Sequence, residues 1–236
     1  MDGSRIHPER PETSGAYTTT RNRVEAYFDG TATKTWERLT SDAPVSGIRA
    51  TVRAGRDEMR SLIIDSLPAD LRGARILDAG CGTGALAFEL AARGADVVGV
   101  DISPQLIGIA QKRTPDAVAG KVSFAAGDML DPSLGGFDHI VAMDSMIYYT
   151  ADDIARILGG IAPRLSGSMI FTVAPRTPLL MAFWRLGKLA PRRDRSPVMI
   201  PHSPAVIASK LGTGRLRDIR RVKSGFYFSN ALEFTA

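Results

Sequence analysis

The nine residues Ile76-Leu77-Asp78-Ala79-Gly80-Cys81-Gly82-Thr83-Gly84 decide the fold of this chain. A short apolar run leads into a turn with glycine at three alternate positions, and an alanine- and leucine-rich helical stretch, residues 85–92, follows. Glycine lacks a Cβ, so the backbone can turn sharply and approach a ligand closely. A second apolar run, residues 96–101, ends in Asp101. A strand, a glycine turn, a helix and a strand that ends in a carboxylate predict a nucleotide-type site at the carboxyl edge of a parallel sheet.

The spacing of the glycines indicates which nucleotide is bound. Enzymes that bind dinucleotides carry G-x-G-x-x-G and hold a pyrophosphate at the helix N-terminus. Here the spacing is G-x-G-x-G and Asp78 precedes it. A carboxylate in this place would repel a pyrophosphate and suits a cationic ligand. The string resembles motif I of the class I S-adenosylmethionine (SAM) methyltransferases; a tight turn whose glycines serve only the backbone is the alternative.

This resemblance implies a set of SAM-binding residues. The glycine loop would pack against the methionine and ribose part of SAM, and Asp101 would bind the ribose hydroxyls. Asp128 follows a third strand and can accept from the adenine amino group while Met129 packs on the ring, although core filling is the commoner use of methionine. Asp144 ends a fourth strand, and we expect it to act on the cofactor side or behind the substrate. The expected cofactor residues are Asp78, Gly80, Cys81, Gly82, Gly84, Asp101, Ile102, Asp128, Met129 and Asp144.

The whole chain alternates strand and helix, which predicts a Rossmann-like α/β fold with a mostly parallel seven-stranded sheet and an antiparallel edge strand. We expect strands at about 75–79, 96–101, 121–126, 137–143, 168–174, 215–223 and 225–234, and helices at 21–40, 47–67, 151–163 and 203–211. The chain then divides into a disordered tail over 1–20, a helical cover over 21–70 and a SAM-binding methyltransferase domain over 71–236. A helical lid over 176–200 is expected to precede the last helix.

Composition and charge narrow the class of protein. The 236 residues contain one cysteine, which excludes an intramolecular disulfide and a cysteine-cluster metal site. Asp78 beside Cys81 would raise the thiol pKa, so we do not expect a nucleophile there. No apolar run of about 18 residues and no secretory signal are present, which predicts a cytoplasmic protein.

The net charge is unevenly distributed along the chain. Residues 76–175 hold 6 basic and 11 acidic side chains, whereas residues 176–236 hold 12 basic and 3 acidic ones. The acidic part suits a sulfonium cation, and the basic end suits an anionic substrate, an anionic membrane or nucleic acid. Against nucleic acid, the basic end lacks interleaved aromatic residues, and strand four lacks the N-P-P-Y or D-P-P-Y type of string of base methylases.

Motifs outside the glycine loop give a narrower resemblance. Residues 24–30 (VEAYFDG), 36–39 (WERL), 52–56 (VRAGR) and 224–229 (SGFYFS) resemble the magnesium-protoporphyrin IX O-methyltransferases of chlorophyll and bacteriochlorophyll biosynthesis, and the resemblance covers residues 21–236. It implies methyl transfer from SAM to the ring C propionate of magnesium protoporphyrin IX. It also implies transient contact with the porphyrin-carrying subunit of magnesium chelatase and peripheral association with the inner photosynthetic membrane. The magnesium belongs to the substrate, and we expect no protein metal site. A methyltransferase for another small anionic or aromatic acceptor, such as a quinone precursor, is the alternative.

The same resemblance implies the residues that meet the substrate. Tyr27 matches the family's catalytic tyrosine, and Tyr148 stands where relatives carry a catalytic histidine. A propionate is already anionic at neutral pH, so no strong general base is required, and positioning in a dry site supplies the rate. The expected substrate-binding residues are Tyr27, Phe28, Tyr148, Arg176, Phe183, Trp184 and Arg185. His139, inside a strand, is expected to be structural.

Overall fold

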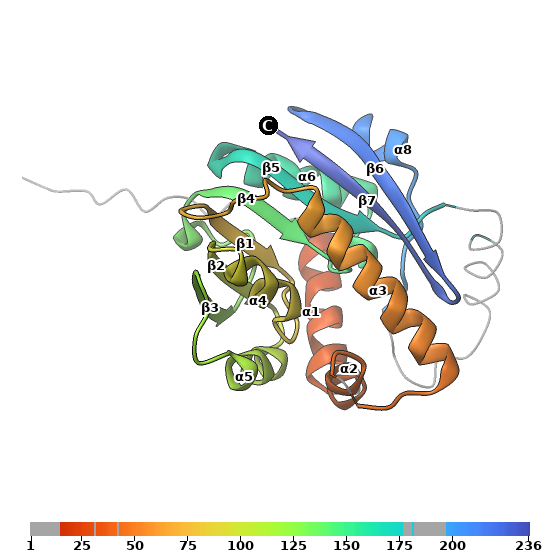
Figure 1. Cartoon of the computed structure of the whole chain (residues 1–236). Helices are drawn as coiled ribbons and strands as arrows, with labels where there is room; N and C mark the ends of the chain where they lie inside the picture. The colour runs from red at the N-terminus through yellow and green to blue at the C-terminus, as the bar shows by residue number, and fades with distance from the viewer. Residues whose placement is uncertain (1–14, 31, 42, 177–180, 182–196) are drawn as a thin grey trace, which may run out of the picture.

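Seven strands form one sheet in the order β3-β2-β1-β4-β5-β7-β6 (Figure 1). The computed structural model describes residues 15–30, 32–41, 43–176, 181 and 197–236. Strands β1 to β5 pair in parallel, and β7 is antiparallel to both β5 and β6. The strands are β1 Arg75–Ala79, β2 Asp96–Asp101, β3 Lys121–Ala126, β4 Phe137–Ala142, β5 Leu165–Val173, β6 Arg215–Ser224 and β7 Tyr227–Thr235. The predicted Rossmann-like class and the mostly parallel seven-stranded sheet are therefore confirmed.

The two last strands close the sheet with antiparallel pairing, as predicted. Gly225 and Phe226 form a two-residue connection that turns the chain from β6 directly back into β7. Strand β7 then pairs with β5 along its other side, so β7 lies one place in from the edge. The edge itself is β6, a strand with few buried side chains.

The helices follow the signals in the sequence. Ser103 begins α5, and its side chain accepts from the N–H of Leu106; Thr150 and Asp153 form a capping box at the start of α6. The helices are α1 Gly15–Asp29, α2 Thr33–Leu39, α3 Gly47–Asp65, α4 Ala85–Ala92, α5 Pro104–Arg113, α6 Ala151–Ile161 and α8 Pro204–Ala208. Three 3₁₀ turns, Pro132–Leu134, Met146–Tyr148 and Ala162–Arg164, complete the connections.

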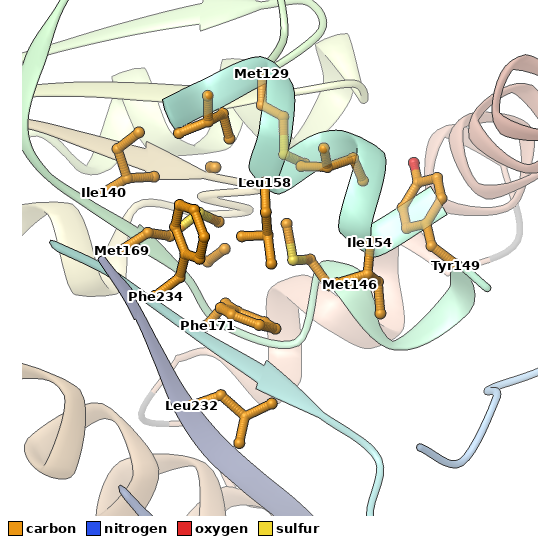
Figure 2. Packing of buried hydrophobic residues seen from close by; sticks show 14 of the residues in the cluster. Met129, Ile140, Met146, Tyr149, Ile154, Leu158, Met169, Phe171, Leu232 and Phe234 are labelled. Atoms are coloured by element: carbon orange, nitrogen blue, oxygen red, sulfur yellow. The ribbon is translucent and has the colours of Figure 1, made fainter. Parts of the chain in front are cut away.

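Alternate residues of the central strands bury themselves on opposite faces of the sheet, as the two-residue period of a strand requires. Leu77, Ile140 and Phe171 pack on the face that α6 covers, and Figure 2 shows this layer with Met146, Ile154 and Leu158. Ile76 and Val141 pack on the other face, against α3 and α4. Helix α3 runs diagonally across that face beside β6 and β7 (Figure 1).

Several predicted boundaries were wrong. Residues 15–20, predicted to be disordered, form the first turns of α1, because Tyr17 is buried and stacks on Tyr149 with ring centroids 5.2 Å apart. The single helix predicted over 21–40 is two helices that end and begin around Gly30. Strand β5 begins at Leu165, three residues early, because Leu165 pairs with Phe137 of β4. Most of the predicted lid, residues 177–180 and 182–196, lies outside the described residues.

Candidate active site

A cavity of about 260 Å³ opens at the carboxyl ends of the central strands. Its walls come from the loops after β1, β2, β3 and β4 and from the N-terminal helices α1, α2 and α3. Neighbours β1 and β4 lead into α4 and α6, which cover opposite faces of the sheet. A crevice at such a point of reversal is the usual ligand site of an open α/β sheet.

The glycine loop forms one wall of the cavity through a backbone that only glycine adopts easily. Gly80 has φ +80° and Gly82 φ +55°, and the N–H of Gly80 donates to the carbonyl of Val100 over 2.7 Å. Both glycines line the cavity. Gly84, at φ +86°, is not a lining residue; it begins α4, and a Cβ there would lie 2.8 Å from the ring of Phe124. The structure therefore gives Gly84 a turn-forming and packing position rather than a place in the cavity wall.

Two buried carboxylates face the same loop, as the sequence predicts. One oxygen of Asp101 accepts from the N–H of Gly82 and the other from the N–H of Ser103, both over 2.9 Å. Each oxygen keeps a second lone pair for a ligand. Asp78 is 1% exposed, and its Oδ2 has no hydrogen-bond partner among the described residues. A buried acceptor without a partner costs free energy unless a ligand supplies the donor, so this wall fits a cationic ligand such as SAM.

Burial raises the pKa of both carboxyl groups. Desolvation, with a smaller contribution from Asp101, raises the pKa of Asp78 to about 7. Desolvation also raises the pKa of Asp101 to about 6, and the two backbone N–H donors oppose it. The Cys81 thiol in the same loop has its pKa raised well above the ordinary value by burial and by these carboxylates. As expected from the sequence, Cys81 is therefore a neutral packing residue.

These pKa values predict that SAM affinity rises with pH. A cation binds the ionised carboxylates, and ionisation of a group with a pKa of about 7 increases about tenfold between pH 6 and pH 8. Calorimetric titration of wild type and Asp78→Asn with SAM over this range checks the expectation. The Asn variant should bind more weakly at pH 8 and lose most of the pH dependence. If SAM affinity rose equally with pH in both proteins, a group other than Asp78 would be responsible for the pH dependence.

The same shifts predict the sign of the pH dependence of stability. Both folded-state pKa values lie above the ordinary 3.8, so between about pH 4 and pH 7 the folded state holds protons that the unfolded state has released. The free energy of unfolding of the SAM-free protein should therefore fall as pH rises through this window. Urea unfolding at pH 5 and pH 7.5 measures this fall in the free energy of unfolding. Added SAM should make the difference between the two pH values smaller.

Asp128 and Met129 lie in the cavity wall at the end of β3, in line with their predicted adenine contact. The structure also joins Asp128 to α1, a link that the sequence analysis missed. The Tyr17 hydroxyl donates to Asp128 Oδ1 over 2.7 Å, and Arg21 forms an ion pair with Oδ2 over 2.9 Å. Asp128, which is predicted to bind the adenine of the cofactor, thus also attaches helix α1 to the cofactor half of the molecule.

Asp144 is the centre of a second polar cluster in the lining of the cavity. It has φ +55°, which is unusual for a residue other than glycine. Its carboxylate forms an ion pair with Arg56 of α3 and accepts from the Tyr227 hydroxyl over 3.0 Å and from Thr172 over 3.2 Å. Arg56 in turn lies over the ring of Trp36, 4.6 Å from its centroid. No local sequence pattern assigns a role to Arg56, Trp36 or Tyr227, although all three lie in the motifs 36–39, 52–56 and 224–229.

Aromatic side chains from α1, α2 and the loop after β4 also line the cavity. Phe28 contacts Trp36 and Tyr148 edge to face, with centroids 5.5 and 6.3 Å away. Burial, Asp144 and Tyr27 raise the pKa of Tyr148 above its ordinary value, so its phenol stays protonated. Tyr27 is half-buried and is not a lining residue; its ring packs edge-on against Phe28 at 5.2 Å. Phe28 and Tyr148 thus lie in the cavity wall, whereas Tyr27 packs behind Phe28 and does not line the cavity.

The remaining predicted residues lie away from the cavity or outside the described part of the chain. Arg176 is exposed and does not line the cavity; its N–H donates to the carbonyl of His202. Phe183, Trp184 and Arg185 are outside the described residues. His139 lies within β4 beside Ser168, and His202 is buried with a ring nitrogen 2.8 Å from the carbonyl oxygen of Tyr149. In the described part of the chain no three histidine, cysteine, aspartate or glutamate side chains gather as a metal site would need.

Comparison with known proteins gives the family. A model described as magnesium-protoporphyrin IX methyltransferase C-terminus matches residues 142–236, and a methyltransferase domain model matches 76–166. The chain is 57% identical over 219 residues to the magnesium-protoporphyrin O-methyltransferase of Rhodobacter capsulatus, which covers 92% of this chain and 97% of that relative. It is 30% identical to the magnesium-protoporphyrin O-methyltransferase of Synechocystis, over 89% of this chain and 94% of the relative. The crystal structure of magnesium protoporphyrin IX methyltransferase from Synechocystis PCC 6803 with bound S-adenosylhomocysteine (SAH) matches with a TM-score of 0.79, at 27% identity, over 91% of this chain and 99% of that chain. The resemblance found in the sequence is thereby confirmed: this chain is a class I SAM-dependent methyltransferase and belongs to the magnesium-protoporphyrin O-methyltransferase family.

Proposed function

We propose that this chain transfers the methyl group of SAM to the ring C propionate of magnesium protoporphyrin IX and forms the monomethyl ester. The observation that carries the proposal is the 57% identity to a magnesium-protoporphyrin O-methyltransferase over nearly the full length of both chains. That relation favours a porphyrin over a quinone precursor as the acceptor. Bound SAM supplies the methyl group as a sulfonium, and Asp78, Asp101, Asp128 and the glycine loop are the residues that would hold it.

The residues of the cavity support a mechanism of positioning rather than proton removal. The nucleophile is a propionate, which is ionised at neutral pH. Tyr148 keeps its proton because its pKa is raised, so it can donate a hydrogen bond to the carboxylate but cannot act as a base. Sulfonium and carboxylate together become neutral products, so exclusion of water favours the transition state over the charged reactants. The helical cover over 21–70 and the lid over 176–200, with Phe183, Trp184 and Arg185 against the macrocycle, are proposed to exclude it.

A direct test combines ligand binding with product analysis. Wild-type protein should bind labelled SAM, shift the absorbance of magnesium protoporphyrin IX on titration, and convert the two into SAH and a monomethyl ester with a mass gain of one methylene. Methylation of a quinone precursor in preference to the porphyrin would overturn the proposal.

The basic C-terminal part of the chain supports two further proposals about partners. Among the described residues no helix has the length and apolar character needed to cross a membrane. Peripheral contact with an anionic membrane, and transient contact with the porphyrin-carrying subunit of magnesium chelatase, would both deliver an apolar porphyrin to the cavity. Co-sedimentation with anionic and with neutral vesicles, at low and high salt, tests the first contact.

Substitution of Tyr27 and Tyr148 tests the role of positioning. Tyr27→Phe and Tyr148→Phe should each lower the single-turnover rate about 10-fold, and at most about 100-fold, the effect of losing one orienting hydrogen bond. Tyr148→His, which restores the residue found in relatives, should keep activity. The rate should be flat between about pH 6 and pH 9 when SAM is saturating at each pH. A unit slope throughout that range, or complete loss of activity in Tyr27→Phe, would show that a base is required.

A further inference from the structure

We infer that Arg56 binds the reacting carboxylate of the substrate and that Asp144 and Trp36 are positioning residues that hold Arg56 in place. This inference rests on the proposed function, because it takes the substrate to be a porphyrin propionate. It gives a role to the string 52–56, which resembles the family but lies outside every cofactor motif.

Three arginines of α3 line the cavity, and two of them are already committed to the protein. Arg53 donates to the backbone carbonyls of Leu39, Arg38 and Ala43 over 2.9 to 3.0 Å, and so fixes the end of α2. Arg60 forms ion pairs with two carboxylates, Asp57 at 3.0 Å and Glu89 at 2.5 Å. Each of these guanidinium groups therefore has fewer of its five N–H donors left for an anionic ligand than Arg56 has.

Arg56 differs from both. Among the described residues its guanidinium has one hydrogen-bond partner, Asp144, although the group carries five N–H donors. Its side chain is 16% exposed, so the remaining donors lie in a largely desolvated wall of the cavity. A guanidinium donates two parallel hydrogen bonds to a carboxylate, and such pairs are stronger when water is excluded. The free donors of Arg56 therefore match the chemistry of a propionate.

The surroundings of Arg56 fix its orientation. Trp36 covers one face of the guanidinium, and Asp144 is itself held by Tyr227 and Thr172. Gly55 permits the close approach of α3 to β7, because a Cβ there would lie 2.6 Å from the ring of Tyr227. The motifs 52–56 and 224–229, far apart in sequence, thus meet at the carboxylate of Asp144. An arginine locked by its neighbours loses little side-chain entropy when it binds.

The position of this cluster places an anion beside the cofactor wall. Asp144 is followed by Ser145, whose hydroxyl donates to the carbonyl of Ala79 over 2.8 Å and whose side chain packs against Gly80. The lining of one cavity therefore includes the carboxylates of Asp78 and Asp101 and the guanidinium of Arg56. Opposite charges in one cavity suit a sulfonium and a carboxylate that must approach each other.

The test compares two ligands that differ only in the reacting group. Magnesium protoporphyrin IX and its ring C monomethyl ester are titrated by fluorescence into Arg56→Gln in the presence of SAH. The diacid should bind about 10- to 100-fold more weakly than to wild type, as expected for a lost charge-assisted hydrogen bond. The monoester should bind within about threefold of wild type, because it no longer carries the carboxylate that Arg56 holds. In the activity assay the KM for porphyrin should rise more than kcat falls.

Control variants separate this role from folding and from overall charge. Arg49→Gln removes the same charge from an exposed position on α3, two turns earlier, and should bind both ligands like wild type. SAM affinity should be unchanged in Arg56→Gln. If that variant does not fold because Asp144 is left without its partner, the double variant Arg56→Gln/Asp144→Asn removes both charges and should show the same loss for the diacid alone.

Two outcomes would overturn the inference. An equal loss of affinity for diacid and monoester would mean that Arg56 binds the other propionate or only maintains the shape of the cavity. Unchanged affinity for both ligands would mean that Arg56 binds no carboxylate. If wild type itself neither bound nor methylated the porphyrin, the proposed function would fail instead, and the two failures are therefore distinguishable.

Discussion

Gly80→Ala should lower SAM affinity by about 100-fold or more. Gly80 has φ +80°, where an L side chain costs about 1–2 kcal/mol, and its Cβ would collide with the Cβ of Ser145, an overpacking that costs about 1–3 kcal/mol more. The loop would relieve this strain by leaving the conformation that faces the cavity. Since 1.4 kcal/mol is a factor of about ten, calorimetry with SAM should detect a large loss, and the free energy of unfolding should fall as well.

Gly108→Ala is the matched control for that experiment. Gly108 lies within α5, and a Cβ there would meet nothing within 4 Å. Alanine favours a helix interior over glycine by about 0.8–1 kcal/mol, so the control should be slightly more stable and should bind SAM normally. SAM affinity of Gly80→Ala within about threefold of wild type would mean that the glycine loop does not form the cofactor wall.

Asp101→Ala should lower SAM affinity by roughly 10- to 150-fold and change the rate at saturating SAM much less. The carboxylate orders the loop through the N–H groups of Gly82 and Ser103, and it lines the cavity in which the ribose is predicted to bind. Loss of hydrogen bonds to a charged group costs about 1.5–3 kcal/mol. Isothermal titration gives the affinity, and single-turnover kinetics gives the rate after binding.

Two further variants sharpen the result. Asp96→Ala removes a carboxylate from the opposite, exposed end of the same strand and should leave SAM affinity unchanged. Asp101→Asn keeps an acceptor for one backbone N–H and should fall between wild type and the alanine variant. An unchanged affinity in Asp101→Ala would remove Asp101 from the cofactor site.

Local sequence was sufficient to predict the cofactor half of the molecule. The apolar runs of β1 and β2, the glycine turn and Asp101 are contiguous or nearly so, and the physical reasons for them are local: strand propensity, backbone freedom at glycine, and helix capping at Ser103. Parallel strands then bring their carboxyl ends to one edge without further information. For this reason Asp78, Asp101 and Asp128 could be placed in one cavity from the sequence alone.

The substrate half depended on contacts between distant segments, which no local pattern encodes. Arg56, Asp144 and Tyr227 come from α3, the end of β4 and the start of β7, and they meet only because α3 crosses the sheet beside β7. Likewise Tyr17 lies in a stretch whose composition predicts disorder. It is nevertheless buried, because its hydroxyl donates a hydrogen bond to Asp128 and its ring stacks on Tyr149. Conformational entropy favours disorder in such a segment, and tertiary contacts alone overcome it. The sequence by itself therefore determined the fold and brought Asp78, Asp101 and Asp128 into one cavity, while the tertiary structure decided which arginine of α3 keeps the most N–H donors for a carboxylate.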